Sequence, residues 1–483
     1  MRFRSIFGVL GMLLCTVGVA LLLPLGVAVY YAEAKVAYAM LGCFVLILGV
    51  GGALVYASGG MHSTEGFTHR EATFIVGFGW LLACLCGALP YMFSGVLPSF
   101  PDAMFESFSG FTTTGATIIP DLEIIPRGIL FWRALTHWLG GIGIIVMFLA
   151  MLPYLGIGGM QLYRAEMPDL FGDKLTPRVR DTALALCFVY FLLSVILLFL
   201  FIAGGMTLFD GVCYTFSVVS SGGFAPWNDS MAHYQSPFLQ WVAIVFMFLA
   251  GMNFAIHHKV LQGKFKTLLK DEEFHLYFLV ALLASVICGF IIWQPGDSME
   301  ESMRQSAFQA VSIMSTTGLI TEDYEKWPFV VQSVLLLLML FGGCAGSTAG
   351  GLKNMRVLLL LKCAYNELFK VVHPKAVRHL KLERMPIPIE MLNSVANFLV
   401  IYIVIFLFGG IFLTAVGIDL ITAFTSALSC LSCVGPSFGV SGPVSTYADF
   451  PNSAKVVLAI IMLLGRIEVY ALLVLLMPEF WRK

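Results

Sequence analysis

The sequence predicts an all-α integral membrane protein of ten transmembrane helices, arranged as four pseudo-repeated units of helix, re-entrant pore loop and helix around a central ion pore. Three observations support this fold. Of the 483 residues, 59% are hydrophobic and only 12% are charged, with a mean hydropathy of +0.89, whereas soluble domains carry about 25% charged residues. Apolar stretches of about 20 residues, enough to cross a bilayer, recur along the chain. Four shorter apolar segments each end in a glycine-containing turn.

Residues 1–60 are expected to form an accessory hairpin of two helices, with spans at 3–31 and 36–58. A signal peptide is the alternative for the first span, because Arg2 and Arg4 precede a long apolar run. A retained span is favoured, because no small-residue cleavage site is obvious near Pro24 and a second hydrophobic run follows at once.

The rest of the chain repeats one order: a span, a short apolar segment, a polar return and a second span. The four predicted pore units are 71–160, 176–265, 272–372 and 388–483. Their paired spans are expected at 72–95 and 128–155, 180–204 and 236–258, 274–294 and 328–360, and 392–416 and 453–477. The short segments between them are Asp102–Thr112, Leu208–Val219, Met303–Ser315 and Leu420–Ser432.

Lys and Arg concentrate in alternate links between the spans, which by the positive-inside rule places both termini in the cytoplasm. The inner basic residues are Arg70, Arg164, Lys174, Arg178, Arg180, Lys259, Lys264, Lys266, Lys270, Arg356 and the run from Lys362 to Arg384. The opposite links are acidic and are expected to form a vestibule that concentrates cations. They contain Asp102, Glu106, Asp121, Glu123, Asp229, Glu300, Glu301, Glu322, Asp323, Glu325 and Asp449.

The four glycine turns are the candidate site. They are Thr113-Thr114-Gly115, Ser220-Ser221-Gly222, Thr316-Thr317-Gly318 and Cys433-Val434-Gly435. Non-helical backbone at membrane depth is tolerated only where it is buried in protein or lines a wet cavity. Glycine can turn its carbonyl toward an axis, and a ring of carbonyls can replace the hydration shell of an ion. Helix C-terminal ends add partial negative charge, which favours a cation. Any one turn alone would be read as an ordinary loop, but four in register favour a pore.

A second glycine-rich stretch, Gly342–Gly351, interrupts the last span of the third unit. Its five glycines each cost about 1 kcal/mol of helix stability relative to Ala, so a flexible loop is favoured over close helix packing through small residues. Arg466 lies within the final predicted span. A cation at that depth costs about 2.5 to 3.5 kcal/mol, so it should face the protein interior. The alternative is a structural pair with Glu468.

Two motifs, Phe111-Thr-Thr-Thr-Gly-Ala-Thr117 and Trp138-Leu-Gly-Gly-Ile-Gly143, together with the extra N-terminal hairpin and the stretch from Glu71 to Tyr91, carry a family resemblance. Over essentially its whole length the chain resembles the TrkH/TrkG/KtrB superfamily of potassium transporters, and most closely its bacterial TrkH branch. The resemblance implies that each unit contributes one strand of a K+-selective filter, with its glycines at Gly115, Gly222, Gly318 and Gly435. Because the fourth strand reads Cys-Val-Gly-Pro, moderate rather than stringent K+/Na+ selectivity is expected.

The resemblance also implies an intramembrane gate below the filter, with Arg466 as a positive barrier that coordinates loop carbonyls. The implied gate residues are Gly342, Gly343, Gly346, Ser347, Thr348, Gly350, Gly351 and Arg466. K+ would be the transported ion, and the chain would form a homodimer in the bacterial inner membrane. A cytosolic TrkA-like ring would bind the regulatory nucleotide, NAD or ATP/ADP, so no cofactor is expected on this chain.

Other classes of function fit the sequence less well. An alternating-access symporter carrying K+ with H+ or Na+ is the main alternative, but the broken helices of such folds usually lie in inverted halves. An enzyme would need a nucleophile or metal set. Cys84/Cys86 and Cys430/Cys433 lack a His or carboxylate at ligand spacing and are expected to be buried hydrophobes. Three histidines, His137, His257 and His258, are expected near span ends, and no nucleic-acid patch is visible.

Overall fold

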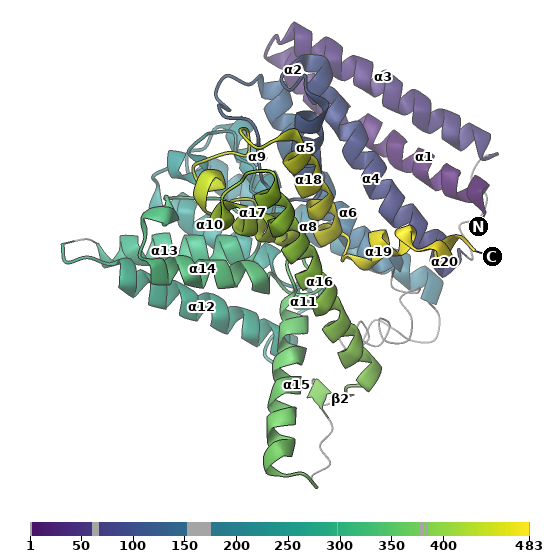
Figure 1. Ribbon diagram of the computed structural model, residues 1–483. Helices are drawn as coiled ribbons and strands as arrows, with labels where there is room; N and C mark the ends of the chain where they lie inside the picture. Colours follow the sequence, from purple (N-terminus) through teal and green to yellow (C-terminus); the bar gives the residue numbers. More distant parts are fainter. Residues whose placement is uncertain are drawn as a thin grey trace.

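The computed structural model describes residues 2–59, 67–151, 175–296, 298–375, 380–382 and 385–482. The described chain is almost wholly helical (Figure 1), and its described strands are β1 (Lys381–Leu382) and β2 (Met385–Pro386), which pair antiparallel with Lys381 opposite Pro386. Within these residues, seven helices are long and apolar enough to cross a membrane, and nine spans result if each of two bent pairs counts as one. The protein is therefore a multi-pass helical membrane protein.

The N-terminal hairpin consists of α1 (Phe3–Ala20), α2 (Leu22–Tyr30) and α3 (Ala34–Ala57). The predicted span 3–31 divides at Leu21, because Pro24 has no N–H to donate to the preceding turn. Glycines bring α1 and α3 close together: a Cβ on Gly11 would lie 2.6 Å from the carbonyl oxygen of Gly51. Small residues at a crossing are how membrane helices pack closely.

The remaining helices are grouped by the four predicted units, in chain order. The first contains α4 (His69–Ser94), α5 (Phe100–Phe111) and α6 (Arg127–Met151), and the second α8 (Leu175–Ala203), α9 (Leu208–Val219), α10 (Pro237–Ala250) and α11 (Phe254–Leu261). The third contains α12 (Glu272–Ile292), α13 (Met299–Met314), α14 (Phe329–Phe341) and α15 (Asn354–Val372). The fourth contains α16 (Ile389–Ala415), α17 (Leu420–Ser432), α18 (Asn452–Arg466), α19 (Tyr470–Leu473) and α20 (Pro478–Trp481). Short 3-10 helices are η2 (Ser230–His233), η3 (Phe265–Thr267), η4 (Tyr324–Lys326), η5 (Gly439–Ser441) and η6 (Val474–Leu476).

Two predicted spans are bent rather than straight. Predicted span 236–258 turns by 103° between α10 and α11, and predicted span 453–477 turns by 114° after α18. The first bend follows Gly251, where Asn253 caps α11 by accepting the Ala255 N–H at 2.9 Å. At the second bend Glu468 and Val469 adopt left-handed backbone (φ of 58° and 59°). Arg466, predicted in the middle of a span, is consequently the last residue of α18.

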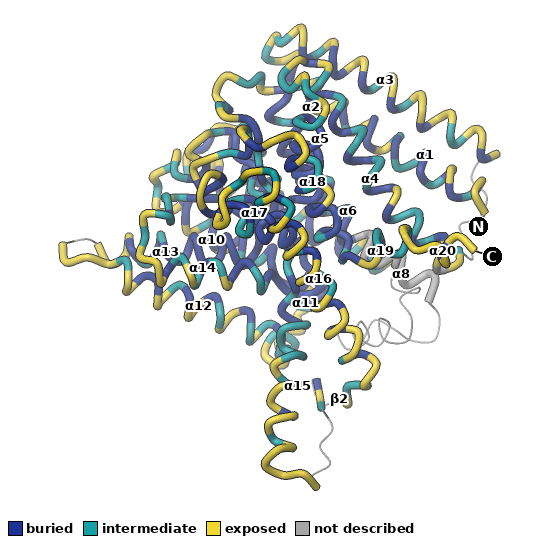
Figure 2. The backbone as a smooth tube through the Cα atoms, in the orientation of Figure 1, coloured by how far each residue is buried: buried dark blue, intermediate teal, exposed yellow. Residues whose placement is uncertain are grey.

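The short helices occupy the centre of the molecule. Figure 2 shows buried backbone concentrated in the middle of the molecule, whereas α3 and α12 at the periphery carry many exposed residues. Every residue from Ala103 to Thr114 is buried. Of the predicted inner basic residues, Arg164, Lys174, Arg378 and Arg384 lie outside the described residues, as do the side chains of Arg178 and Arg180 and segment 152–160 of the predicted first unit.

Candidate functional site

The helices α5, α9, α13 and α17 end in the same turn. In each, one non-glycine residue adopts left-handed backbone just past the helix: Thr113, Ser221, Thr316 and Cys433, with φ of 53°, 56°, 55° and 57°. In the first turn the Thr113 N–H donates to the Gly110 carbonyl (3.1 Å) and the Thr114 N–H to the Ser109 carbonyl (2.9 Å), and the other three repeat both bonds. This is the Schellman end of a helix. A left-handed non-glycine residue costs about 1–3 kcal/mol and persists only where the surroundings enforce it.

A left-handed glycine follows two residues later in every turn. These glycines are Gly115, Gly223, Gly318 and Gly435, with φ of 81°, 88°, 73° and 99°. The sequence prediction for the second turn, Ser220-Ser221-Gly222, is therefore one residue early. Ser220 is the helical C-cap of α9, and the segment equivalent to Thr113-Thr114-Gly115 is Ser221-Gly222-Gly223. The other three predicted segments keep their register.

The four turns touch one another in a closed cycle. A Cβ on Gly115 would collide with the Gly222 carbonyl, one on Gly223 with the Thr317 carbonyl, and one on Gly318 with the Val434 carbonyl. A Cβ on Gly435 would lie 2.5 Å from the carbonyl oxygen of Thr114. Thr114 belongs to the first turn, so the cycle is closed. Each glycine thus packs against the carbonyl that precedes the next glycine, and no side chain fits there. All four glycines line one cavity of about 100 Å³, here called the mouth.

A serine that was not singled out from the sequence precedes each turn, and in three of the four its hydroxyl supports the turn. Ser217, Ser312 and Ser429 donate their hydroxyls to the carbonyls of Phe224, Leu319 (2.6 Å) and Pro436 (2.8 Å), which directly follow the glycines. Ser109 holds the same place in the first turn, but its hydroxyl has no partner among the described residues. The serine precedes the glycine by six positions in all four units. That constant spacing could have identified Gly223 as the glycine of the second turn, because Ser217 precedes Gly222 by only five positions.

Two further side chains join the first turn to the second. His137, expected near a span end, lies well inside α6 and is fully buried. Its Nε2 accepts the Phe224 N–H (3.2 Å), so its Nδ1 donates to the Gly110 carbonyl (2.7 Å). Arg133 lies over the Phe224 ring at 3.8 Å and donates to the Ala225 carbonyl at 3.1 Å.

The partner of Arg133 is Glu106, at 2.6 Å. Glu106 is completely buried and also accepts the Ile118 N–H at 3.0 Å. Its predicted place in an open acidic vestibule is therefore wrong, because the carboxylate serves as a buried counter-ion. Asp102, from the same predicted vestibule, is paired with Lys455 at 2.8 Å.

The glycine-rich stretch forms the predicted break in the third unit, since α14 ends at Phe341 and α15 begins at Asn354. Residues 342–351, here called the loop, lie against the ring of turns on the side away from the mouth. The Gly350 N–H donates to Thr316 Oγ1 at 2.7 Å, and Thr348 Oγ1 is 2.9 Å from Ser221 Oγ. A Cβ on Gly350 would lie 2.9 Å from the Cβ of Cys433. The loop therefore contacts three of the four turns.

Arg466 secures the loop to the remaining unit. Its guanidinium is buried and donates to the Thr348 carbonyl at 2.6 Å and to the Gly140 carbonyl of α6 at 3.2 Å. The alternative pairing with Glu468 is wrong, because Glu468 pairs with Arg356 at 2.6 Å. A second cavity of about 90 Å³ is lined by Gly346, Gly350, Arg466 and Glu468 among others. The loop and Arg466 thus line this cavity and do not line the mouth.

The described residues contain no cluster of three or more His, Cys, Asp or Glu side chains that could hold a metal ion. All eleven cysteines are free thiols. The polar groups gathered at the site are backbone carbonyls, hydroxyls, the His137 imidazole, the Glu106 carboxylate and the guanidinium groups of Arg133 and Arg466.

The protein is thus of the class of multi-pass helical membrane proteins, with four short helices whose C-terminal ends meet in a ring of backbone turns. The TrkH family model, described as a cation transport protein, matches residues 41–293 and 297–483. The chain belongs to this family, as the resemblance predicted.

Individual relatives cover the whole chain. It is 38% identical to the Trk system potassium uptake protein TrkH of Salmonella typhimurium over the full length of both chains. It is 34% identical to the Trk system potassium uptake protein TrkG of Escherichia coli over 99% of each. The crystal structure of the potassium transporter TrkH from Vibrio parahaemolyticus superposes with a TM-score of 0.91 at 34% identity, covering all of both chains.

Proposed function

We propose that this chain carries K+ into the cell through the ring of four turns. The observation that carries the proposal is the closed cycle in which each of Gly115, Gly223, Gly318 and Gly435 packs on the carbonyl before the next glycine. Such a ring can present carbonyl oxygens to a dehydrated cation from all sides. Relatives that match along the whole chain are named as potassium uptake proteins.

The filter in this proposal consists of Thr113-Thr114-Gly115, Ser221-Gly222-Gly223, Thr316-Thr317-Gly318 and Cys433-Val434-Gly435. The C-terminal ends of α5, α9, α13 and α17 face it, and their partial negative charge favours a cation over an anion. The four strands differ in sequence, so K+/Na+ selectivity is expected to be moderate.

The loop and Arg466 form the gate in the same proposal. The guanidinium is a full positive charge beside the ion path, held by the carbonyls of Thr348 and Gly140. A cation that passes the ring meets this charge, so conduction requires the loop and Arg466 to move aside. Gly342, Gly346 and Gly351, all with left-handed backbone, supply the turns of the loop.

The family and the charge pattern support a proposal for the wider assembly. Counting α14, the loop and α15 as one span gives ten spans in four pore units, with both termini in the cytoplasm of a bacterial cell. The exposed basic links on that side suit docking of a TrkA-like ring that binds NAD or ATP/ADP, and the chain would act as a homodimer.

The test is ion flux through the purified chain in liposomes, read as single-channel current and as selectivity. Discrete current steps with K+ preferred over Na+ are expected, together with growth rescue of a K+-uptake-deficient host at low K+. Slow saturable exchange without current steps, as an alternating-access symporter would give, would contradict the pore. Equal permeability for K+ and Na+ would contradict the filter.

A further inference from the structure

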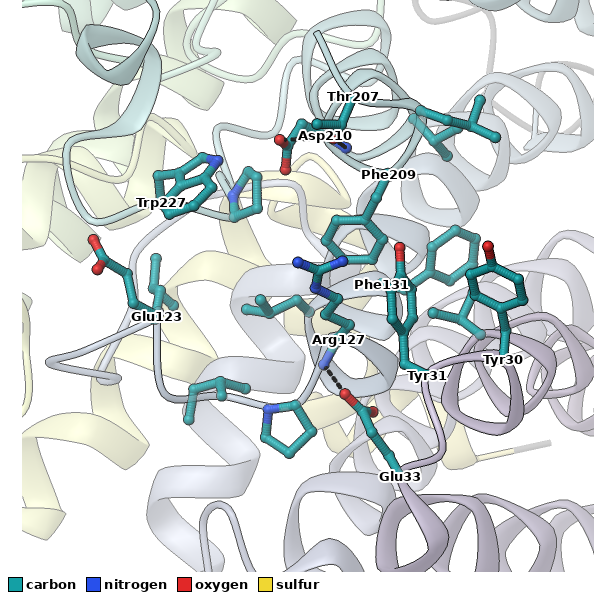
Figure 3. Close-up of a pocket in the computed structure, with 18 of the residues that line it drawn as sticks. Tyr30, Tyr31, Glu33, Glu123, Arg127, Phe131, Thr207, Phe209, Asp210 and Trp227 are labelled. Carbon is teal, nitrogen blue, oxygen red and sulfur yellow. Dashed lines mark hydrogen bonds between the residues drawn. The ribbon is translucent and has the colours of Figure 1, made fainter.

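A large cavity opens away from the ring, between α2, the linker before α6, and the start of α9 (Figure 3). Its volume of about 1000 Å³ is at the upper end of the roughly 300–1,000 Å³ typical of ligand pockets. Leu122 and Trp227 line both this cavity and the mouth. The cavity therefore lies on the mouth side of the membrane.

One wall of the cavity is apolar and faces outward. Leu23, Tyr30 and Leu208 line it and are 56%, 82% and 66% exposed. Aromatic side chains at span ends are typical of the membrane interface, where an apolar ring meets the headgroup layer. This wall is therefore positioned to contact lipid.

The polar end of the cavity holds one unpaired cation. Arg127 is exposed, and its guanidinium lies 4.4 Å from the Tyr31 ring centre and 5.5 Å from that of Phe209, which fixes its position by cation–π attraction. Within the described chain no carboxylate forms an ion pair with this guanidinium, because Glu33 accepts the backbone N–H groups of Arg127 (2.6 Å) and Gly128 (2.9 Å) instead. Asp210 is likewise occupied by the hydroxyls of Thr207 and Tyr234.

One unpaired anion faces the same cavity. Glu123 is exposed, lines the cavity and has no ion-pair partner among the described residues. Figure 3 shows Arg127 at the centre of the cavity and Glu123 across it from Tyr30 and Tyr31. The indole N–H of Trp227, also in the lining, is buried without a hydrogen-bond partner in the described structure. The lining thus contains one cation, Arg127, and three carboxylates, of which Glu33 and Asp210 accept hydrogen bonds within the protein and Glu123 remains available to a ligand.

We propose that this cavity binds a phospholipid with an amine-bearing, zwitterionic headgroup from the leaflet on the mouth side. The phosphodiester contacts Arg127, whose planar guanidinium suits phosphate oxygens. The ammonium group lies toward Glu123, and the acyl chains lie along Leu23, Tyr30 and Leu208. Phosphatidylglycerol, an anionic lipid, has the same phosphodiester for Arg127 but ends in a neutral glycerol, so it lacks the cation that pairs with Glu123. The proposal does not depend on whether the ring conducts K+.

The experiment uses the full-length protein, stripped of lipid in detergent and mixed with equal amounts of dioleoyl phosphatidylethanolamine and dioleoyl phosphatidylglycerol. Retained lipid is counted by native mass spectrometry. The wild type should retain phosphatidylethanolamine roughly tenfold better than phosphatidylglycerol, the scale of one charge-assisted contact. Arg127→Gln should lose this retention, whereas Lys326→Gln, which removes an 81%-exposed cation elsewhere, should keep it.

Glu123→Lys provides a gain of function that a folding defect cannot imitate. It leaves two cations in the cavity, so phosphatidylglycerol should now be retained in preference to phosphatidylethanolamine. Equal retention of both lipids by the wild type, unchanged retention by Arg127→Gln, or a phosphatidylethanolamine preference kept by Glu123→Lys would each overturn the proposal.

Discussion

The ring of turns and the loop beneath it are built in opposite ways. The ring takes one turn from each of four units, and each turn repeats the same left-handed residue, the same glycine and the same contact with its neighbour. The loop comes from the third unit alone, and its bonds to Thr316 and Ser221 have no counterpart elsewhere in the described chain.

The difference between a repeated ring and a single loop matches the different roles proposed for the two. In the proposed function the ring would coordinate an ion from all sides, which needs equivalent groups around one axis, and repetition supplies them. The loop would close the path, which needs one element that can move while the rest stays in place. Changes in the ring should therefore alter stability or selectivity, whereas changes in the loop should alter the rate of conduction.

The largest expected effect is on the support of the ring. Glu106→Gln leaves the buried Arg133 without its counter-ion, and removing one partner of a buried pair costs roughly 3–5 kcal/mol. The free energy of unfolding in detergent should fall by that amount. Lys326→Gln, which breaks an exposed pair with Asp323, should change it by less than about 1 kcal/mol. Similar losses for the two variants would show that the buried pair does not hold the ring.

The next effect concerns the loop. Two like charges a few ångströms apart repel by roughly 2–4 kcal/mol at an effective dielectric constant of 20, so Arg466→Ala should raise K+ flux at least about tenfold. The K+/Na+ permeability ratio should stay unchanged, because the ring is untouched. Arg466→Lys, which keeps the charge, should remain slow.

Deletion of residues 343–350 should raise flux in the same liposome assay. Unchanged or lower flux in folded Arg466→Ala and in the deletion would count against the gate.

The smallest expected effect distinguishes the third turn, supported by Ser312, from the first turn, which contains Ser109. Ser312→Ala removes the hydroxyl bonded to the Leu319 carbonyl and should lower the free energy of unfolding by about 1 kcal/mol. Ser109→Ala makes the same change where the hydroxyl has no partner among the described residues, so it should have almost no effect. Equal losses at the two positions would mean that the serine contributes through packing and not through its hydrogen bond.

Much of this architecture can be predicted from the sequence because membrane helices are defined by local composition. The predicted short segments Leu208–Val219 and Leu420–Ser432 coincide with α9 and α17, and the break at 342–351 follows from its glycines. Local propensity is sufficient in these places, since no distant contact is needed to start or stop the helix.

The sequence predictions are wrong where contacts between distant parts of the chain determine the local structure. The bend after α10 lies in a continuous apolar run, but the Gly251 carbonyl accepts the Cys344 N–H (2.8 Å) and the Phe254 N–H donates to the Gly346 carbonyl (3.1 Å). The loop of the third unit therefore fixes a bend in the second. The predicted register of the second turn is wrong for a related reason. Gly222 and Gly223 are adjacent in the sequence, and the contact of Gly223 with the Thr317 carbonyl is what distinguishes them.

The assignment of the ring as the filter is tested most directly by the K+/Na+ permeability ratio of Gly223→Ser in liposomes, measured beside that of Gly205→Ser. Both glycines have left-handed backbone, with φ of 88° and 99°, but Gly205 has open space around its Cβ position whereas Gly223 faces the Thr317 carbonyl. Gly223→Ser is expected to bring the permeability ratio close to one, whereas Gly205→Ser should leave it at the wild-type value. A Gly223→Ser variant that is folded and retains wild-type selectivity would contradict the assignment of this ring as the filter.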